Sequence, residues 1–280
     1  MTVNCSQLLV LGSILIAVLG LPFSASAEEK YYLSLGDSIA AGYQPNGAVG
    51  QGYADQLQAK IPSFRLKKLG CYTDETTVAM IHGGACLYPH HTQLAEAVDF
   101  LKDHKHSVAL ITIDIGANDV MNCSITRPLD MGCIHRALTA IKTNLPSILH
   151  ELRVAAPGVP IVGMNYYDPY LAYWLLGDRA FATDTLSAFD QFNDTLERIY
   201  KGAGSPVANV EGAFSTTDFA TQVVSPDFGT IPLNVARICQ WTWMCVALGP
   251  DIHPNKEGYR IITRAFLKVL PSPVEPEPER

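Results

Sequence analysis

The sequence predicts an α/β fold in which helices cover both faces of a mainly parallel sheet, a three-layer α/β/α sandwich. Short apolar segments of strand length alternate with longer segments of helical periodicity. The apolar segments do not alternate with polar residues, as is typical of parallel strands that are buried on both faces. The chain has 280 residues, of which 48% are hydrophobic and 17% charged, so it can fold as one large domain.

The apolar segments predict strands at 31–35, 64–69, 108–115, 159–164 and 207–210. Apolar residues at helical spacing predict helices between and after them, at 53–61, after the N-cap Thr92, and at 129–156, 180–200 and 256–270. Because Pro146 lies inside the longest of these helices, we expect a kink or a break there.

Both ends of the chain differ from the folded domain, which is expected at 28–270. Residues 1–27 carry no Lys, Arg, Asp or Glu, and an apolar run at 8–21 precedes Ala25-Ser26-Ala27. This pattern is typical of a signal peptide cleaved after Ala27, and hence of a secreted protein. A membrane anchor is the alternative, but the run is short for a span of about 20 residues, so we expect no stable membrane span in the mature chain. The tail at 271–280 is rich in Pro and Glu and is expected to be disordered.

Six cysteines follow the predicted signal peptide, and an even number in an exported chain suggests disulfides. They can pair in many ways, and we predict that nearest neighbours in the sequence pair, which gives Cys71–Cys86, Cys123–Cys133 and Cys239–Cys245. The alternative, a metal site, is disfavoured because no C-x-x-C occurs.

The charge of the chain argues against nucleic acid as a partner. The formal net charge is −7, and no cluster of Lys and Arg occurs beyond Lys67-Lys68. Nucleic-acid-binding proteins usually carry a basic stripe. A small-molecule partner is therefore expected, and the sequence does not indicate the oligomeric state.

Polar motifs follow the ends of predicted strands, where ligands bind in parallel sheets. The first is Gly36-Asp37-Ser38, after the strand at 31–35. A serine at the start of a helical turn is well placed as a nucleophile, since backbone N–H groups there can stabilise an oxyanion. Asp37 can cap the helix. An ordinary capped turn is the alternative.

Two further motifs complete this chemistry. Gly116-Ala117-Asn118-Asp119 follows the most apolar strand, and the Asn118 amide can donate a hydrogen bond to an oxyanion. Asp251-Ile252-His253-Pro254 precedes the last helix, and His253 could accept the proton of Ser38. Taken alone, the Asn-Asp pair could be a turn and the histidine a surface residue.

The three motifs, in this order, resemble the GDSL/SGNH hydrolases over most of the mature chain. The segments 68–77, 165–169 and 241–245 are similar to a secreted, disulfide-containing bacterial esterase branch. The resemblance implies a flavodoxin-like SGNH fold and a serine hydrolase without cofactor or metal. Ser38 would be the nucleophile, His253 the general base, and the Ser38 N–H and Asn118 the oxyanion donors.

Two positions depart from the family pattern. Asp74 stands where the family usually has a glycine whose N–H is the third oxyanion donor, and Asp accepts a positive φ only at a cost. Three residues before His253, where the family has its triad Asp, stands Pro250. Either the Asp251 carboxylate or the Pro250 carbonyl could orient the histidine, and the sequence leaves both open.

The expected reaction is hydrolysis of a carboxylic ester, in a lipid, an acylated sugar or a small ester, through an acyl-enzyme. Asp74 favours the alternative, a catalytically impaired binding module that keeps the pocket. A nucleotide-binding protein is disfavoured because the chain has neither G-x-G-x-x-G nor a P-loop lysine. Asp114 could be a buried support or merely structural, and Asp168 a turn residue. The pocket walls are expected from 170–176 and 214–231.

Overall fold

A computed structural model describes residues 29–123, 127–246 and 250–271. Its centre is a five-stranded sheet in the order β2-β1-β3-β4-β5, and every neighbouring pair in it is parallel. The strands are β1 (Lys30–Gly36), β2 (Phe64–Lys68), β3 (Val108–Asp114), β4 (Ile161–Met164) and β5 (Val207–Ala208). The predicted signal peptide and nearly all of the predicted tail lie outside the described residues.

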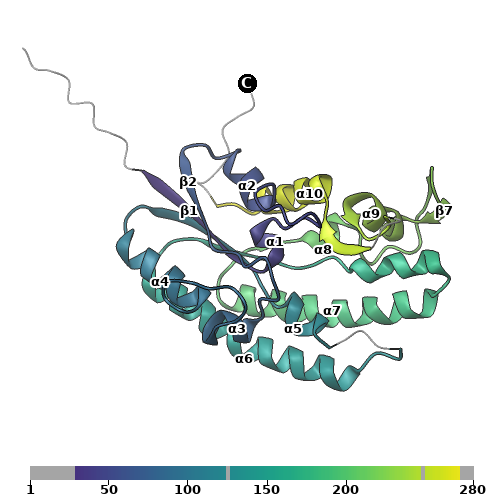
Figure 1. Cartoon of the computed structure of the whole chain (residues 1–280), viewed down its shortest axis with the longest axis horizontal. Coiled ribbons are helices and arrows are strands. Elements are labelled where there is room, and N and C mark those ends of the chain that lie inside the picture. Colours follow the sequence, from purple (N-terminus) through teal and green to yellow (C-terminus); the bar gives the residue numbers. More distant parts are fainter. Residues whose placement is uncertain (1–28, 124–126, 247–249, 272–280) are drawn as a thin grey trace, which may run out of the picture.

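Helices lie on both faces of the sheet, which confirms the three-layer sandwich (Figure 1). One layer contains α3 (Thr77–His82), α4 (Gln93–Asp103), α5 (Ala117–Met121), α6 (Met131–Ala155) and α7 (Arg179–Gly202). The other contains α2 (Tyr53–Gln58), α8 (Val210–Ala213), α9 (Leu233–Trp241) and α10 (Lys256–Leu267). Within each layer the helices contact one another, as α6 does α7 and α10 does α2.

Pro146 does not break α6, which runs as one helix from Met131 to Ala155. The proline lies on the exposed side of the helix, where water can bond the carbonyl that its missing N–H leaves free. The opposite side, with Leu145, Ile148 and Leu149, is buried. Packing of that apolar side therefore outweighs the local cost of the proline.

The last predicted strand is shorter than expected. Only Val207 and Ala208 pair with β4, and α8 begins at Val210, where the Asn209 side chain caps it by accepting from the Gly212 N–H. Other elements carried no clear pattern in the sequence. Among them are the helices α3 and α9, the 3₁₀ helix η1 (Pro169–Leu176), the hairpin of β6 (Gln222–Ser225) and β7 (Gly229–Pro232), and the pair of β8 (Thr242–Trp243) with β9 (Asp251–Pro254).

Disulfides join Cys71 to Cys86, Cys123 to Cys133 and Cys239 to Cys245, which is the nearest-neighbour pairing. Each closes a short loop outside the central sheet.

Candidate active site

The three sequence motifs meet at the carboxyl ends of the strands. Ser38 is the first residue of α1 (Ser38–Ala41), directly after β1. Asn118 lies in α5, just beyond β3, and His253 lies in β9. All three line one cavity of about 30 Å³. The parallel sheet brings them together because its strands end at the same edge.

Ser38, His253 and Asp251 form a continuous hydrogen-bonded line. His253 Nε2 lies 2.8 Å from Ser38 Oγ, and His253 Nδ1 lies 2.7 Å from Asp251 Oδ1. The backbone N–H of His253 donates to the same carboxylate oxygen, at 2.8 Å. Of the two orienting groups that the sequence left open, the Asp251 carboxylate rather than the Pro250 carbonyl is thus the one bonded to the ring.

The environment of Asp251 keeps it ionised. Burial by itself raises the pKa of this carboxyl, but the hydrogen bonds from the ring and the backbone N–H of His253 more than offset this and hold the pKa below its usual value. The ring of Tyr43 packs against His253, with centroids 4.6 Å apart. Both contacts fix the orientation of the imidazole ring.

The turn that carries Ser38 is held from several sides. Asp37 caps α1 through Oδ1, which accepts from the Ile39 N–H at 2.9 Å. The buried Gln93 side chain pins the end of β1, because its Oε1 accepts from the Gly36 N–H at 2.7 Å and its Nε2 donates to the Gly36 carbonyl at 2.9 Å. No sequence signal pointed to Gln93, whose polar side chain at the start of a helix is typical of an exposed residue.

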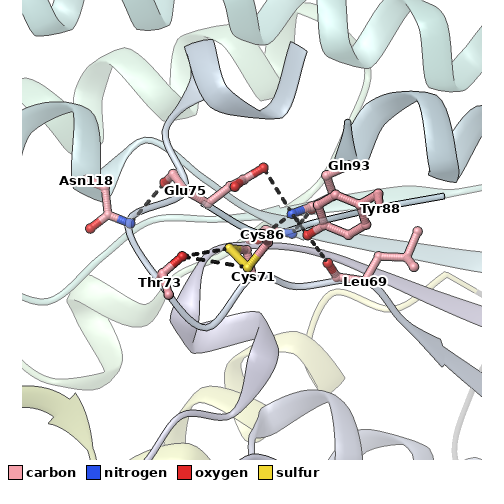
Figure 2. The surroundings of a disulfide bond; sticks show 9 residues. Leu69, Cys71, Thr73, Glu75, Cys86, Tyr88, Gln93 and Asn118 are labelled. Atoms are coloured by element: carbon pink, nitrogen blue, oxygen red, sulfur yellow. Dashed lines mark hydrogen bonds between the residues drawn. A yellow bond between two sulfur atoms is a disulfide. The ribbon is translucent and has the colours of Figure 1, made fainter. Parts of the chain in front are cut away.

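The Asn118 amide is anchored by a main-chain carbonyl. Its Nδ2 donates to the Glu75 carbonyl at 2.9 Å, as Figure 2 shows. An amide nitrogen has two hydrogens, so a second one remains for a ligand in the cavity. The neighbouring Asp119 accepts from both the N–H and the hydroxyl of Thr77, which joins α5 to the start of α3.

Asp74 is exposed and is not among the residues that line the cavity. Its φ is not positive, since the non-glycine residues with positive φ in the described part of the chain are His91 and Ser215. The strain that the sequence suggested at this position is therefore absent.

Two other acids considered from the sequence are fully buried. Asp168 caps η1 through its hydrogen bond to the Tyr170 N–H at 2.8 Å. Burial raises its pKa to about 7. Asp114 ends β3 beneath the Ser38 turn, with its Oδ1 2.6 Å from the Tyr53 hydroxyl.

The expected pocket walls are wrong for the cavity at Ser38. Its apolar lining comes instead from Ile39, Ala117, Met121, Tyr166, Tyr167, Pro169, Phe189 and Ile252. Members of 170–176 and 214–231 line a separate apolar groove of about 350 Å³, with Tyr173, Leu176 and Phe228 among them. Of the residues of η1, only Pro169 lines the cavity at Ser38, and later ones line the apolar groove.

Within the described ranges, no group of three or more His, Cys, Asp or Glu side chains is placed to hold a metal ion. None of the helices in these ranges has the length and apolar character to cross a bilayer.

Comparison with known proteins gives the class. Similar solved structures are a phospholipase A1 from Streptomyces albidoflavus (16% identity, 85% of this chain and 98% of that one covered, TM-score 0.55) and a lipase from a goat rumen metagenome (14%, 88% and 100%, TM-score 0.55). Another is an α/β hydrolase from a lake metagenome in Spain (18%, 85% and 94%, TM-score 0.51). At these identities the likeness shows the fold. No curated protein matches the chain.

The family itself follows from the sequence match. The model of the GDSL-like lipase/acylhydrolase family matches residues 34–261. The chain therefore belongs to this family, and is an ester hydrolase of the esterase and lipase kind.

Proposed function

We propose that the protein is a secreted serine esterase that hydrolyses carboxylic esters through an acyl-enzyme on Ser38. The hydrogen-bonded line from Ser38 through His253 to Asp251 carries this proposal. A serine hydroxyl is a weak nucleophile until a base accepts its proton, and a neutral histidine 2.8 Å away can do so.

In the first half of the reaction, Ser38 Oγ attacks the ester carbonyl while His253 Nε2 takes the hydroxyl proton. Asp251 stabilises the imidazolium that forms. The Ser38 N–H and the second Asn118 amide hydrogen stabilise the oxyanion. His253 then protonates the leaving alcohol, and the same groups activate water to release the acid.

The size of the cavity favours short acyl groups. A water molecule needs roughly 10–15 Å³ of such volume, so about 30 Å³ holds about two waters. The cavity accepts an acyl group about as small as acetyl, and the alcohol part of the ester lies outside it. Three disulfides and the apolar N-terminal run support secretion.

The test is hydrolysis of p-nitrophenyl acetate, together with covalent labelling by a fluorophosphonate. We expect both in the unmodified protein, and Ser38→Ala should abolish both while the far-UV circular dichroism spectrum is kept. Ser34→Ala, at a buried serine of β1, is the matched control. Labelling that persists in Ser38→Ala would reject Ser38 as nucleophile, and absence of hydrolysis with every ester would favour the binding module.

A further inference from the structure

Two carboxyl groups lie together beneath the turn that carries Ser38. Asp37 and Asp114 are both buried, and their carboxyl groups accept from adjacent N–H groups of α1, Asp37 Oδ1 from Ile39 and Asp114 Oδ2 from Ala40. Their backbones are joined as well, since the Asp37 N–H donates to the Asp114 carbonyl at 3.1 Å. A Cβ at Gly36, whose φ is 136°, would overlap that carbonyl oxygen, so only glycine allows the two chains to approach so closely.

Two buried carboxyl groups on the same helical turn repel each other if both are ionised, and they can bond each other only if one holds a proton, because an ionised carboxylate has only acceptors. A pair of buried anions would also need a compensating cation. Among the described residues, neither group forms an ion pair with a Lys or Arg. The pair therefore carries one proton and a single negative charge.

The surroundings decide which group holds the proton. Asp37 lines the cavity beside His253, caps the N-terminus of α1 and accepts from the Tyr166 hydroxyl at 3.1 Å. Burial raises the pKa of Asp37, but each of these contacts lowers it and favours the ionised form. Asp114 lies deeper, at the end of a central strand, and does not line the cavity. Burial and then the charge of Asp37 raise the pKa of Asp114 well above its usual value.

We infer that Asp114 is a neutral carboxylic acid whose proton forms the hydrogen bond to the Asp37 carboxylate, and that Asp114 thereby positions the turn that carries Ser38. Its other contacts hold the carboxyl group against the turn, since Oδ1 accepts from the Tyr53 hydroxyl and Oδ2 from the Ala40 N–H at 3.1 Å. These two bonds by themselves lower the pKa of Asp114, but burial and the charge of Asp37 outweigh them. Asp114 thus touches both the cap residue of α1 and the helix itself.

The charge left on Asp37 has a consequence for the reaction, and this part rests on the proposed function. Transfer of the Ser38 proton makes His253 a cation, and an anion nearby favours that state. Asp37 adds to the effect of Asp251 without touching the reacting atoms. The titratable groups that face the pair are Tyr32, Tyr53, Glu75, Asp119, Tyr166, Tyr167, Tyr200, His253 and Tyr259.

Carbon-13 NMR of the aspartate side-chain carboxyl groups tests the proton directly and needs no activity. We expect one aspartate to stay protonated at pH 8, and Asp114→Asn to remove that resonance. Asp168→Asn is the matched control, because it should remove only a resonance that titrates near pH 7. If Asp114→Asn leaves the protonated resonance in place, or if no aspartate is protonated at pH 8, the inference is overturned.

Activity tests the positioning role. Asparagine can donate the same hydrogen bond to Asp37, whereas leucine has a similar size and no donor. We expect Asp114→Leu to lower kcat/KM by roughly 30-fold or more, and Asp114→Asn to recover most of that loss. Equal losses in the two folded variants would contradict a hydrogen-bonding role. If the NMR result holds but the unmodified protein hydrolyses no ester, the proposed function fails and the protonation state stands.

Discussion

His253 has a hydrogen-bond partner on each ring nitrogen, Ser38 on Nε2 and Asp251 on Nδ1. Nδ1 must carry the proton if Nε2 is to accept one, and the Asp251 carboxylate enforces this tautomer. We expect Asp251→Asn to lower kcat/KM by up to about 10,000-fold, the loss in kcat that the corresponding change causes in serine proteases. Steady-state kinetics with p-nitrophenyl acetate measures it.

The matched control for that change is Asp227→Asn, at an exposed residue between β6 and β7, which should leave kcat/KM within about threefold. A loss of less than about tenfold in Asp251→Asn would show that the carboxylate is dispensable. The Pro250 carbonyl would then again be the candidate for orienting the ring.

Glu75 is a buried acid without a cation, and its Oε2 has no hydrogen-bond partner among the described residues. Burial and then the charge of Asp37 raise its pKa to about 7. For an acid whose folded-state pKa is raised, the stability contribution is complete below the unfolded value near 4.5 and is lost as the pH rises through about 7.

Glu75→Gln should therefore raise the free energy of unfolding at pH 8 by on the order of 1 kcal/mol relative to the unmodified protein, with little difference at pH 4. The backbone carbonyl that holds Asn118 is unchanged by this substitution. Urea unfolding at both pH values measures the effect, with Glu151→Gln on the exposed side of α6 as control. A difference that is the same at both pH values would contradict the raised pKa.

The residues that follow strand ends could be found from the sequence, but those that support them could not. Ser38, Asn118 and His253 each stand in a short polar motif next to a predicted strand or helix. Gln93 and Tyr166 contact the Ser38 turn from 57 and 129 residues away. Hydrogen bonds between residues so far apart in the sequence form only when the chain has folded, so no local sequence pattern predicts them.

At the scale of elements, burial decided what the sequence could predict. The apolar segments predicted β1, β3 and β4 because strands covered by helices must be apolar on both faces. The edge strand β2 (FRLKK) is only partly buried and carries a weaker pattern. The strands β8 and β9 were not predicted, because two such short antiparallel strands contain too few residues to show an alternation of polar and apolar positions. It is nevertheless β9 that places His253 and Asp251.

Met121, the last residue of α5, is half-buried and lines the cavity that we propose takes the acyl group. Met121→Ala removes three heavy atoms and enlarges the space beside Asn118. We expect the ratio of kcat/KM for p-nitrophenyl butyrate to that for the acetate to rise by about tenfold.

Met131→Ala, at the exposed start of α6, is the control and should leave this ratio unchanged. A series of p-nitrophenyl esters from acetate to decanoate measures both variants. If the unmodified protein already prefers the long esters, acyl chains bind elsewhere, and the apolar groove beside η1 becomes the candidate.

In the whole molecule, each of the three disulfides lies next to a segment that supports the candidate active site. Cys71–Cys86 encloses Glu75, whose carbonyl holds Asn118. Cys123–Cys133 follows α5 directly, and Cys239–Cys245 encloses β8, the partner of β9. Cys71 also touches the turn that carries Ser38, because its N–H donates to the Gly36 carbonyl at 3.0 Å.

Reduction should therefore damage the site before it unfolds the sheet. In the loop-entropy account, the loss of unfolding free energy follows loop length, about 3 kcal/mol for the 15-residue separation of Cys71–Cys86 and about 2 kcal/mol for the 6-residue separation of Cys239–Cys245. We therefore expect the double variant Cys71→Ser/Cys86→Ser to have a lower free energy of unfolding than the double variant Cys239→Ser/Cys245→Ser.

Activity distinguishes a local role of these disulfides from a general loss of stability. One loop contains Glu75, which holds Asn118, and the other contains β8, which pairs with the strand of His253. Both double serine variants should therefore lose kcat/KM by about tenfold or more at 25 °C. Circular dichroism at this temperature should still report a folded sheet and helices. Kinetics and urea unfolding on the same samples measure the two effects. Full activity in folded variants that lack these disulfides would mean that the sheet alone positions Asn118 and His253.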